Sequence, residues 1–201
     1  VDRCAPEAAA LGAVNCVVPE PDGTLVGENT DGPGFLDALE ADLGASPEGR
    51  RCVVLGAGGA ARAVVLALAG AGASEVVVVN RTSDRAVAAA SLAPGVARVG
   101  TVEEAGGAEL VVNATSVGMD GATSPLPPGT IASGQIVVDL VYHPAETPLL
   151  AEAATAGAAV ANGLGMLVHQ AAHAFRLWTG EAAPVGVMAE AVQGHLSSPG
   201  H

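Results

Sequence analysis

A glycine-rich turn carries the clearest chemical signal in the sequence. Gly56, Gly58 and Ala61 form a G-x-G-x-x-A pattern directly after an apolar run at residues 52–55 and before an alanine-rich helical stretch. The first glycine permits a tight turn, the second lets the backbone approach a pyrophosphate, and the alanine lets the helix pack closely on the strand. Free N–H groups at the start of that helix attract the anion. The pattern predicts a dinucleotide-binding turn formed by Gly56, Ala57, Gly58, Gly59 and Ala60.

Basic residues after the next apolar run indicate which dinucleotide binds. The run at residues 75–79 is followed by Asn80, Arg81 and Thr82, with Arg85 one helical turn further on. No acid stands where a carboxylate would accept a hydrogen bond from a ribose 2′-hydroxyl. Guanidinium groups form bidentate, charge-assisted bonds with phosphate. We therefore predict NADP as the cofactor, with these four residues around its 2′-phosphate; the alternative is that the arginines only solvate the start of a helix.

Regular alternation of apolar strands and helices must position these groups. Unbroken apolar strands separated by helices are typical of a parallel sheet covered on both faces, so the predicted fold class is α/β with a Rossmann-type doubly wound sheet over residues 51–162. The expected strands are 52–55, 75–79, 97–99, 110–113, 136–140 and 158–161, and the expected helices are 60–71, 83–92 and one that begins at Thr147 and Pro148.

Shorter elements flank this region. Residues 13–18 and 24–28 have strand composition around a Pro-Asp-Gly turn, although the sequence does not decide whether they pair with each other. Helical spacing of apolar residues follows at 34–44, then a linker at 46–49. Two further helices are expected at 163–178 and 184–196, before a short polar end.

Composition excludes several classes of function. The net charge of −13 comes from 21 acids against eight arginines, and the chain contains no lysine. Nucleic acid is an unsuitable partner because phosphate neutralisation needs clusters of basic residues. The longest apolar stretch, residues 52–73, is interrupted by an arginine and several glycines, so we expect no membrane span and a cytoplasmic protein.

Neither cysteines nor histidines predict a metal site. Cys4, Cys16 and Cys52 match no CxxC pair and no zinc pattern, which favours reduced thiols. His169 and His173 lie four residues apart on a predicted helix, but no third ligand accompanies them, so we assign them a structural role.

Seven segments, taken in order, resemble the shikimate dehydrogenase family of NADP-dependent enzymes, which interconvert 3-dehydroshikimate and shikimate. The resemblance spans about residues 8–178. The matching segments are Gly-Ala-Val-Asn (12–15), Asn-Thr-Asp-Gly (29–32), Gly-Ala-Gly-Gly-Ala (56–60), Asn-Arg-Thr (80–82), Asn-Ala-Thr-Ser-Val-Gly-Met (113–119), Asp-Leu-Val-Tyr (139–142) with Thr-Pro (147–148), and Asn-Gly-Leu-Gly-Met-Leu-Val-His-Gln (162–170).

The resemblance implies a role for each matching position. It implies substrate binding by Asn15, Asp31, Tyr142 and Gln170, with Asp31 also the acidic member of the catalytic pair. The spacing adds that Asp31 falls just before a helix, whose dipole favours the ionised carboxylate; alone, that position would be an ordinary helix N-cap. The further residues implied at the cofactor site are Ala114, Thr115 and Ser116 beneath the cofactor, and Leu140, Gly163 and Met166 around the nicotinamide.

The same resemblance divides the chain and exposes a gap. It implies that residues 1–31 are a remnant of a separate α/β substrate domain, 32–50 a connecting helix and linker, 51–162 the NADP-binding domain, and 163–201 helices that pack back towards the substrate domain. The family pairs its catalytic aspartate with a lysine upstream of residue 12, and this chain has none. We therefore expect a fragment of an enzyme, monomeric or homodimeric when whole, that is inactive alone. The alternatives are a quinate/shikimate dehydrogenase of broader specificity and a non-catalytic NADP-binding module.

Overall fold

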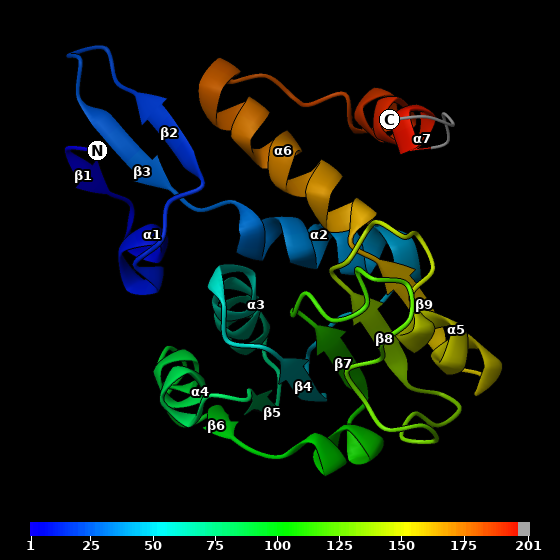
Figure 1. Cartoon of the computed structure of the whole chain (residues 1–201). Coiled ribbons are helices and arrows are strands. Elements are labelled where there is room, and N and C mark those ends of the chain that lie inside the picture. The colour runs from blue at the N-terminus through cyan, green and yellow to red at the C-terminus, as the bar shows by residue number, and fades with distance from the viewer. Residues whose placement is uncertain (197–201) are drawn as a thin grey trace.

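A six-stranded parallel sheet forms the centre of the molecule in the computed structural model, which describes residues 1–196 (Figure 1). The strand order is β6-β5-β4-β7-β8-β9, and every neighbouring pair is parallel. Because the order reverses beside the first strand, this is the 3-2-1-4-5-6 arrangement of doubly wound dinucleotide-binding folds, and the predicted fold class is confirmed. The strands are β4 Arg51–Leu55, β5 Glu75–Val79, β6 Ala97–Val99, β7 Leu110–Asn113, β8 Ile136–Asp139 and β9 Ala159–Asn162.

Both faces of the four central strands, β5, β4, β7 and β8, are buried, which explains why these strands are apolar without alternation. Cys52 and Val54 face one core, which receives side chains from α2, α3, α4 and α6; Val53 and Leu55 face a second core, which receives side chains from α5 and the 3-10 helix η1. Valine and alanine fill most of both cores, so helices and strands approach closely. The covering elements are α3 Gly59–Gly70, α4 Ser83–Ala90, η1 Val102–Gly107 and α5 Pro148–Thr155.

A small three-stranded sheet precedes the large one. Its strands are β1 Arg3–Cys4, β2 Cys16–Pro19 and β3 Leu25–Glu28, with α1 Pro6–Leu11 between the first two. The central strand β3 pairs parallel to β1 and antiparallel to β2, which settles the pairing that the sequence left open. A proline is tolerated at the end of β2 because that strand lies at the edge of its sheet.

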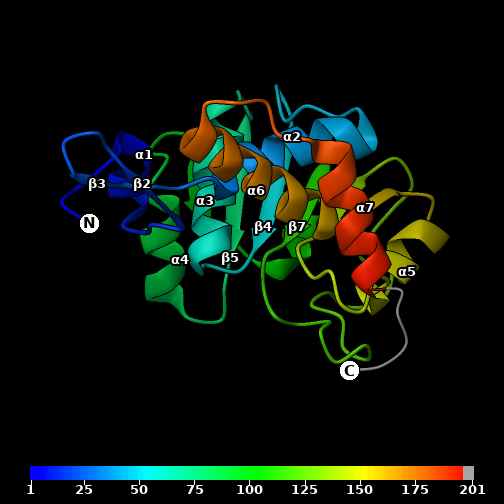
Figure 2. The same cartoon turned by 90° about the horizontal axis from the view of Figure 1, so that it is seen from above.

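Two helices, α2 and α6, connect the small sheet to the large one, and a third, α7, packs beside them. Helix α2, Asp31–Leu43, packs against α6, Leu164–Thr179, and α7, Val185–Leu196, packs in turn on α6 (Figures 1 and 2). At the far end of α6, the indole Nε1 of Trp178 donates a hydrogen bond of 2.9 Å to the backbone oxygen of Val17 on β2. The long helix α6 therefore contacts both sheets.

Helix α2 begins earlier than the sequence predicts. The expected start at residue 34 is wrong: the helix includes Asp31, Gly32 and Pro33, while its end before Gly44 is as expected. Proline in a first helical turn loses no backbone hydrogen bond, so it does not delay the helix. Close tertiary packing at Gly32 and Gly34 compensates for the low helix propensity of glycine.

Other differences concern element ends and two short elements. Strand β2 starts at residue 16 rather than 13, because the N–H of Ala13 bonds back to Ala8 at the end of α1. Helix α4 stops at residue 90 rather than 92, where the Ser91 hydroxyl donates to the carbonyl of Ala88. Strand β1 and helix η1 are not predicted, although the Thr101 and Glu104 capping box of η1 is visible in the sequence. The remaining boundaries agree within one residue, and the predicted polar end, residues 197–201, lies outside the described part.

No helix between residues 1 and 196 is both long and apolar enough to cross a membrane.

Candidate functional site

A cleft of about 660 Å³ opens at the carboxyl ends of β4, β5 and β7. Ligands of doubly wound folds bind at this edge, where the strand order reverses. The cleft brings together most residues predicted to contact the cofactor. Those that line it are Gly56, Ala57, Gly58, Asn80, Arg81, Thr82, Arg85, Ala114, Thr115 and Ser116.

Gly56 and Gly58 are required for different reasons, one for the fold and the other for ligand access. Gly56 has a φ of +112°, and a β-carbon there would lie 2.7 Å from the carbonyl oxygen of Ala114, so the fold itself requires glycine. Gly58 has a φ of −79°, and a β-carbon at Gly58 or Gly59 would meet nothing within 4 Å. No side chain caps the start of α3, so its first N–H groups are available to a ligand. The open space and the free donors fit a pyrophosphate.

Positive charge is concentrated at the far side of this cleft. Arg81 and Arg85 are exposed, and in the described part of the chain neither has an ion-pair partner. Arg51 and Arg98, in contrast, are held by Glu75 and Glu104 in a cluster away from the cleft. The cleft is thus a locally cationic place in a strongly acidic protein, which fits a 2′-phosphate.

A second cluster of polar side chains forms where α2 begins. The Nδ2 of Asn15 donates to the Oδ1 of Asp31 over 2.7 Å and to the Oγ1 of Thr30 over 3.1 Å, and the Thr30 N–H donates back to Asn15 over 2.9 Å. The Thr30 hydroxyl also lies 3.4 Å from the Oε1 of Gln170 on α6. Thr30 therefore joins three residues that the resemblance assigns to the substrate.

The position of Asp31 corrects one expectation. Asp31 is the first residue of α2 rather than the residue before it, and Thr30 occupies the N-cap position. The Asp31 side chain is consequently free to accept from Asn15 instead of capping the helix. Burial raises the pKa of the Asp31 carboxyl above its usual value, and the hydrogen bond from Asn15 opposes that rise. A carboxyl with a raised pKa is suited to proton transfer.

A third polar network lies entirely inside the protein, where β7 and β8 end. Asn113, Asp139 and Thr147 are each at most 1% exposed. Asp139 accepts from the Asn113 amide over 2.8 Å, from the Val141 N–H over 3.0 Å and from the Thr147 hydroxyl over 2.7 Å. Burial raises the pKa of Asp139, and these three donors, Thr147 foremost, oppose the rise.

The other residues with predicted roles lie outside the cleft lining. Tyr142 is 43% exposed in the segment after β8. Leu140 and Gly163 touch, because a β-carbon on Gly163 would overlap the Leu140 carbonyl. Met166 is buried in the core between α2 and the sheet. Gly59 and Ala60 form the start of α3.

The two histidines of α6 lie beside an aspartate and do not belong to a group of metal ligands in the described residues. The Nε2 of His173 lies 2.8 Å from a carboxylate oxygen of Asp37 on α2, and His169 lies 3.9 Å from the same oxygen. Within residues 1–196, no group of three potential metal ligands comes together.

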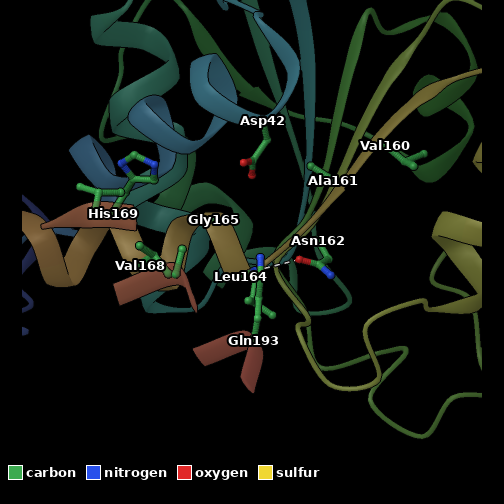
Figure 3. A pocket seen from close by; sticks show the side chains of 11 residues that line it. Asp42, Val160, Ala161, Asn162, Leu164, Gly165, Val168, His169 and Gln193 are labelled. Atoms are coloured by element: carbon green, nitrogen blue, oxygen red, sulfur yellow. Dashed lines mark hydrogen bonds between the residues drawn. The ribbon is translucent and has the colours of Figure 1, made fainter. Parts of the chain in front are cut away.

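A separate cavity of about 330 Å³ lies between α2, β9, α6 and α7 (Figure 3). Its lining includes Asp42, Asn162, His169 and Gln193, and it shares no lining residue with the cofactor cleft. Asn162 already accepts from the N–H of Leu164 and donates to the carbonyl of Ala145, so it is held as part of the fold.

The sequence assigned no role at the site to Thr30, Asn113 or Asp139, and assigned Thr147 only the start of a helix. All four lie within the segments that resemble the family, and the last three stand at a strand end or a helix cap. A polar residue that ends an otherwise apolar buried strand was the available signal.

Comparisons with known proteins agree with this geometry. Residues 39–117 match the family model described as shikimate / quinate 5-dehydrogenase, and residues 163–193 match the model of the shikimate 5′-dehydrogenase C-terminal domain. The shikimate dehydrogenase (NADP(+)) of Citrifermentans bemidjiense is 48% identical over 213 residues, covering 100% of this chain and 73% of that protein. The one from Moorella thermoacetica is 50% identical over 200 residues, covering 94% and 67% respectively.

Solved structures are equally similar. Shikimate 5-dehydrogenase from Thermus thermophilus, in complex with NADP(H) and shikimate, superimposes with a TM-score of 0.89 at 47% identity, over 96% of this chain and 72% of that one. Quinate dehydrogenase from Corynebacterium glutamicum, in complex with NAD, gives a TM-score of 0.89 at 34% identity, over 96% and 72%. With relatives at this identity aligned along its whole length, the chain belongs to the shikimate dehydrogenase family.

Proposed function

We propose that this protein catalyses the NADP-dependent, reversible reduction of 3-dehydroshikimate to shikimate. The observation that carries the proposal is the junction of Asn15, Asp31 and Gln170 through Thr30. These residues come from the loop before β2, the start of α2 and the middle of α6, and they present an amide, a carboxyl and a second amide together. Such a set of donors and acceptors suits a polyhydroxylated substrate, because each hydroxyl both donates and accepts.

The cofactor cleft supports NADP as the redox partner. The turn at Gly58 and Gly59 would hold the pyrophosphate on the free N–H groups of α3, and Arg81 and Arg85 would hold the 2′-phosphate. Thr115 and Ser116 would lie along the wall of the cleft, while Leu140, Gly163 and Met166 are proposed nearer the nicotinamide. When bound, the nicotinamide supplies or accepts the hydride.

Asp31 is the proposed proton-handling group among these residues. Reduction of a ketone requires one proton on the carbonyl oxygen, and oxidation of the alcohol releases it. The Asn15 amide orients the Asp31 carboxyl, and burial holds its pKa nearer the range in which it exchanges protons. We propose that Tyr142 and Gln170 complete the substrate contacts from the segment after β8 and from α6.

The experiment measures cofactor binding and turnover separately. The 201 residues contain no lysine, the residue that the resemblance pairs with Asp31, so we expect these residues by themselves to bind NADP but to oxidise shikimate negligibly. A chimera that adds the N-terminal domain of the Citrifermentans bemidjiense relative, where the resemblance places the lysine, should turn over. An inactive chimera that still binds NADP would favour a non-catalytic binding module, and a chain without NADP affinity would overturn the proposal.

A broader specificity is the second candidate, because a quinate dehydrogenase solved with NAD has the same fold at 34% identity. Assays of the chimera with quinate and shikimate, each with NAD and NADP, separate the two. We expect shikimate with NADP to be preferred, since Arg81 and Arg85 face the cleft.

A further inference from the structure

The buried Asp139 carboxylate lies where two functional segments meet. One is the segment 114–117, which forms a wall of the cofactor cleft, and the other is the segment 140–147, which carries Tyr142. The two segments leave neighbouring parallel strands, and Asn113 pairs in register with Asp139. Any group that links the ends of β7 and β8 therefore links the cofactor wall to the Tyr142 segment.

The first segment is fixed through the Asn113 amide. Its Oδ1 accepts from the N–H of Thr115 over 3.1 Å and from the Thr115 hydroxyl over 2.7 Å. Its Nδ2 donates to the carbonyl of Val117 over 3.0 Å and to Asp139 over 2.8 Å. All bonding capacity of this amide is used, so its orientation has no alternative, and the bond to Asp139 anchors it.

The second segment is fixed at both of its ends by the same carboxylate. One oxygen of Asp139 accepts from the N–H of Val141, and the other accepts from the hydroxyl of Thr147. The Thr147 hydroxyl also accepts from the N–H of Leu150 and so caps α5. The segment from 140 to 147 is consequently held between two points that one side chain defines.

Stability alone is a poor reason for a carboxylate at this place. The neighbouring positions of β8 are Val137 and Val138, and the described contacts of Asp139 include no cation. Burying a carboxylate without a cationic partner costs free energy that neutral donors offset only in part. What the carboxylate adds is the capacity to accept hydrogen bonds from three separate parts of the chain, at Asn113, Val141 and Thr147.

The geometry points to Asp139 as a positioning residue that holds the cofactor wall at 114–117 and the Tyr142 segment at 140–147 in one fixed arrangement. The statement that this arrangement serves catalysis rests on the proposed function. The carboxylate contacts neither segment's predicted ligand-binding side chains, so it acts through Asn113 and Thr147.

Two substitutions distinguish the positioning role of Asp139 from the volume that its side chain fills. Asp139→Asn keeps an oxygen for Asn113 and Val141 and presents an N–H to the Thr147 oxygen, so most of the network survives. Asp139→Leu keeps the volume and removes every acceptor. We expect Asp139→Leu to weaken NADP binding by about tenfold or more and, in the active chimera, to raise the KM for NADP more than it lowers kcat. Asp139→Asn should stay within about threefold of the unmodified protein.

Hydrogen exchange supplies a readout that does not depend on the cofactor. Asp139→Leu should speed amide exchange in both segments, 114–117 and 140–147, in the protein without ligands. Val77→Ala, which opens a cavity in β5 away from both segments, is the control for lost stability alone. It should lower the unfolding temperature without moving the dissociation constant for NADP.

If Asp139→Leu does not fold, Thr147→Val tests the same inference at one end of the network, with Thr147→Ser as the conservative rescue. Unchanged exchange in both segments, or a loss of stability with unchanged NADP binding in protein that otherwise binds it, would overturn the inference. Failure of the unmodified protein to bind NADP would instead count against the proposed function, and the exchange measurement would still decide the role of Asp139.

Discussion

Gly34 on α2 lies so close to Gln170 on α6 that a β-carbon on Gly34 would stand 2.6 Å from the Gln170 backbone nitrogen. The same crossing places Thr30, one turn earlier on α2, beside the Gln170 amide. A second close approach follows along the pair, where Gly165 faces Asp42 and Ala38. The distance between α2 and α6 is therefore set by glycines that lack a side chain, and the contact between Thr30 and Gln170 depends on that distance.

Gly34→Ala should push the two helices apart. A contact of 2.6 Å to backbone atoms cannot be relieved by rotating a side chain, so we expect a loss of about 1–3 kcal/mol in the free energy of unfolding. The KM for shikimate should rise in the active chimera because Gln170 moves away from Thr30. Gly70→Ala is the matched control: nothing lies within 4 Å of its β-carbon, and in α3 it should stabilise by up to about 1 kcal/mol. Equal stability of the two variants would refute this account of the crossing.

Two glycines of the nucleotide turn should respond in opposite ways. Gly58→Ala meets open space at an ordinary φ, so stability should stay within about 0.5 kcal/mol of the unmodified protein while NADP binding weakens. Gly56→Ala combines a positive φ with a 2.7 Å contact to Ala114, so it should lower stability first. Thermal unfolding and calorimetric titration with NADP distinguish the two variants. An unchanged NADP affinity in Gly58→Ala would show that the pyrophosphate does not bind at this turn.

Arg81 should determine the choice between NADP and NAD. Arg81→Asp removes a donor to the 2′-phosphate and places a repelling charge there, so NADP affinity should fall by about tenfold or more while NAD affinity falls less. Arg176→Asp, an exposed change of equal charge in the last turn of α6, is the control and should leave the ratio unaltered. Equal affinity of the unmodified protein for both cofactors would contradict the prediction.

Asp31→Asn should separate function from stability. Because burial raises the folded-state pKa of Asp31, the stability linked to this group is fully present below its unfolded pKa of about 3.9 and is lost as the pH rises through the raised value. The variant should therefore be more stable than the unmodified protein at pH 7, and the difference should close as the pH falls below about 4. Turnover of the active chimera should drop by about 10²–10⁴-fold.

Asp120→Asn provides a control of opposite sign. The Thr123 hydroxyl and the N–H groups of Ala122 and Thr123 lower the pKa of Asp120 to about 2, so its stability contribution is present above the unfolded pKa and is lost as the pH falls towards 2. The variant should be less stable at pH 7, and this deficit should vanish in acid. Urea unfolding of both variants across pH 2–7 checks the pair; parallel pH profiles would show that the assigned causes are wrong.

The central strands of the large sheet, β4, β5, β7 and β8, were predictable because each is built around a continuous apolar run. Boundaries failed where a contact distant in sequence decided them. Gly32, Pro33 and Gly34 resemble a loop by propensity, and only the crossing with α6 shows why they are helical. The residues of the cofactor cleft could be predicted because their pattern is local. The contact between Thr30 and Gln170, in contrast, spans 140 residues, and the grouping of Asn15, Asp31 and Gln170 was expected only through resemblance.

The buried network was not predicted for a similar reason. Asn113 and Asp139 are 26 residues apart, and each alone is an ordinary polar residue at a strand end. Only the parallel register of β7 and β8 places them opposite each other. Register between two parallel strands joined by a long connection depends on the packing of the whole sheet, which no local window contains.

Trp178 gives the molecule an internal optical probe. It is the only tryptophan of the chain, it is 60% exposed, and its indole N–H is bonded to the edge of the small sheet. Its emission colour and lifetime therefore depend on whether α6 and β2 remain in contact, with no second chromophore of its kind to average over. Any movement of the small sheet during a catalytic cycle can be followed in real time in the unlabelled protein.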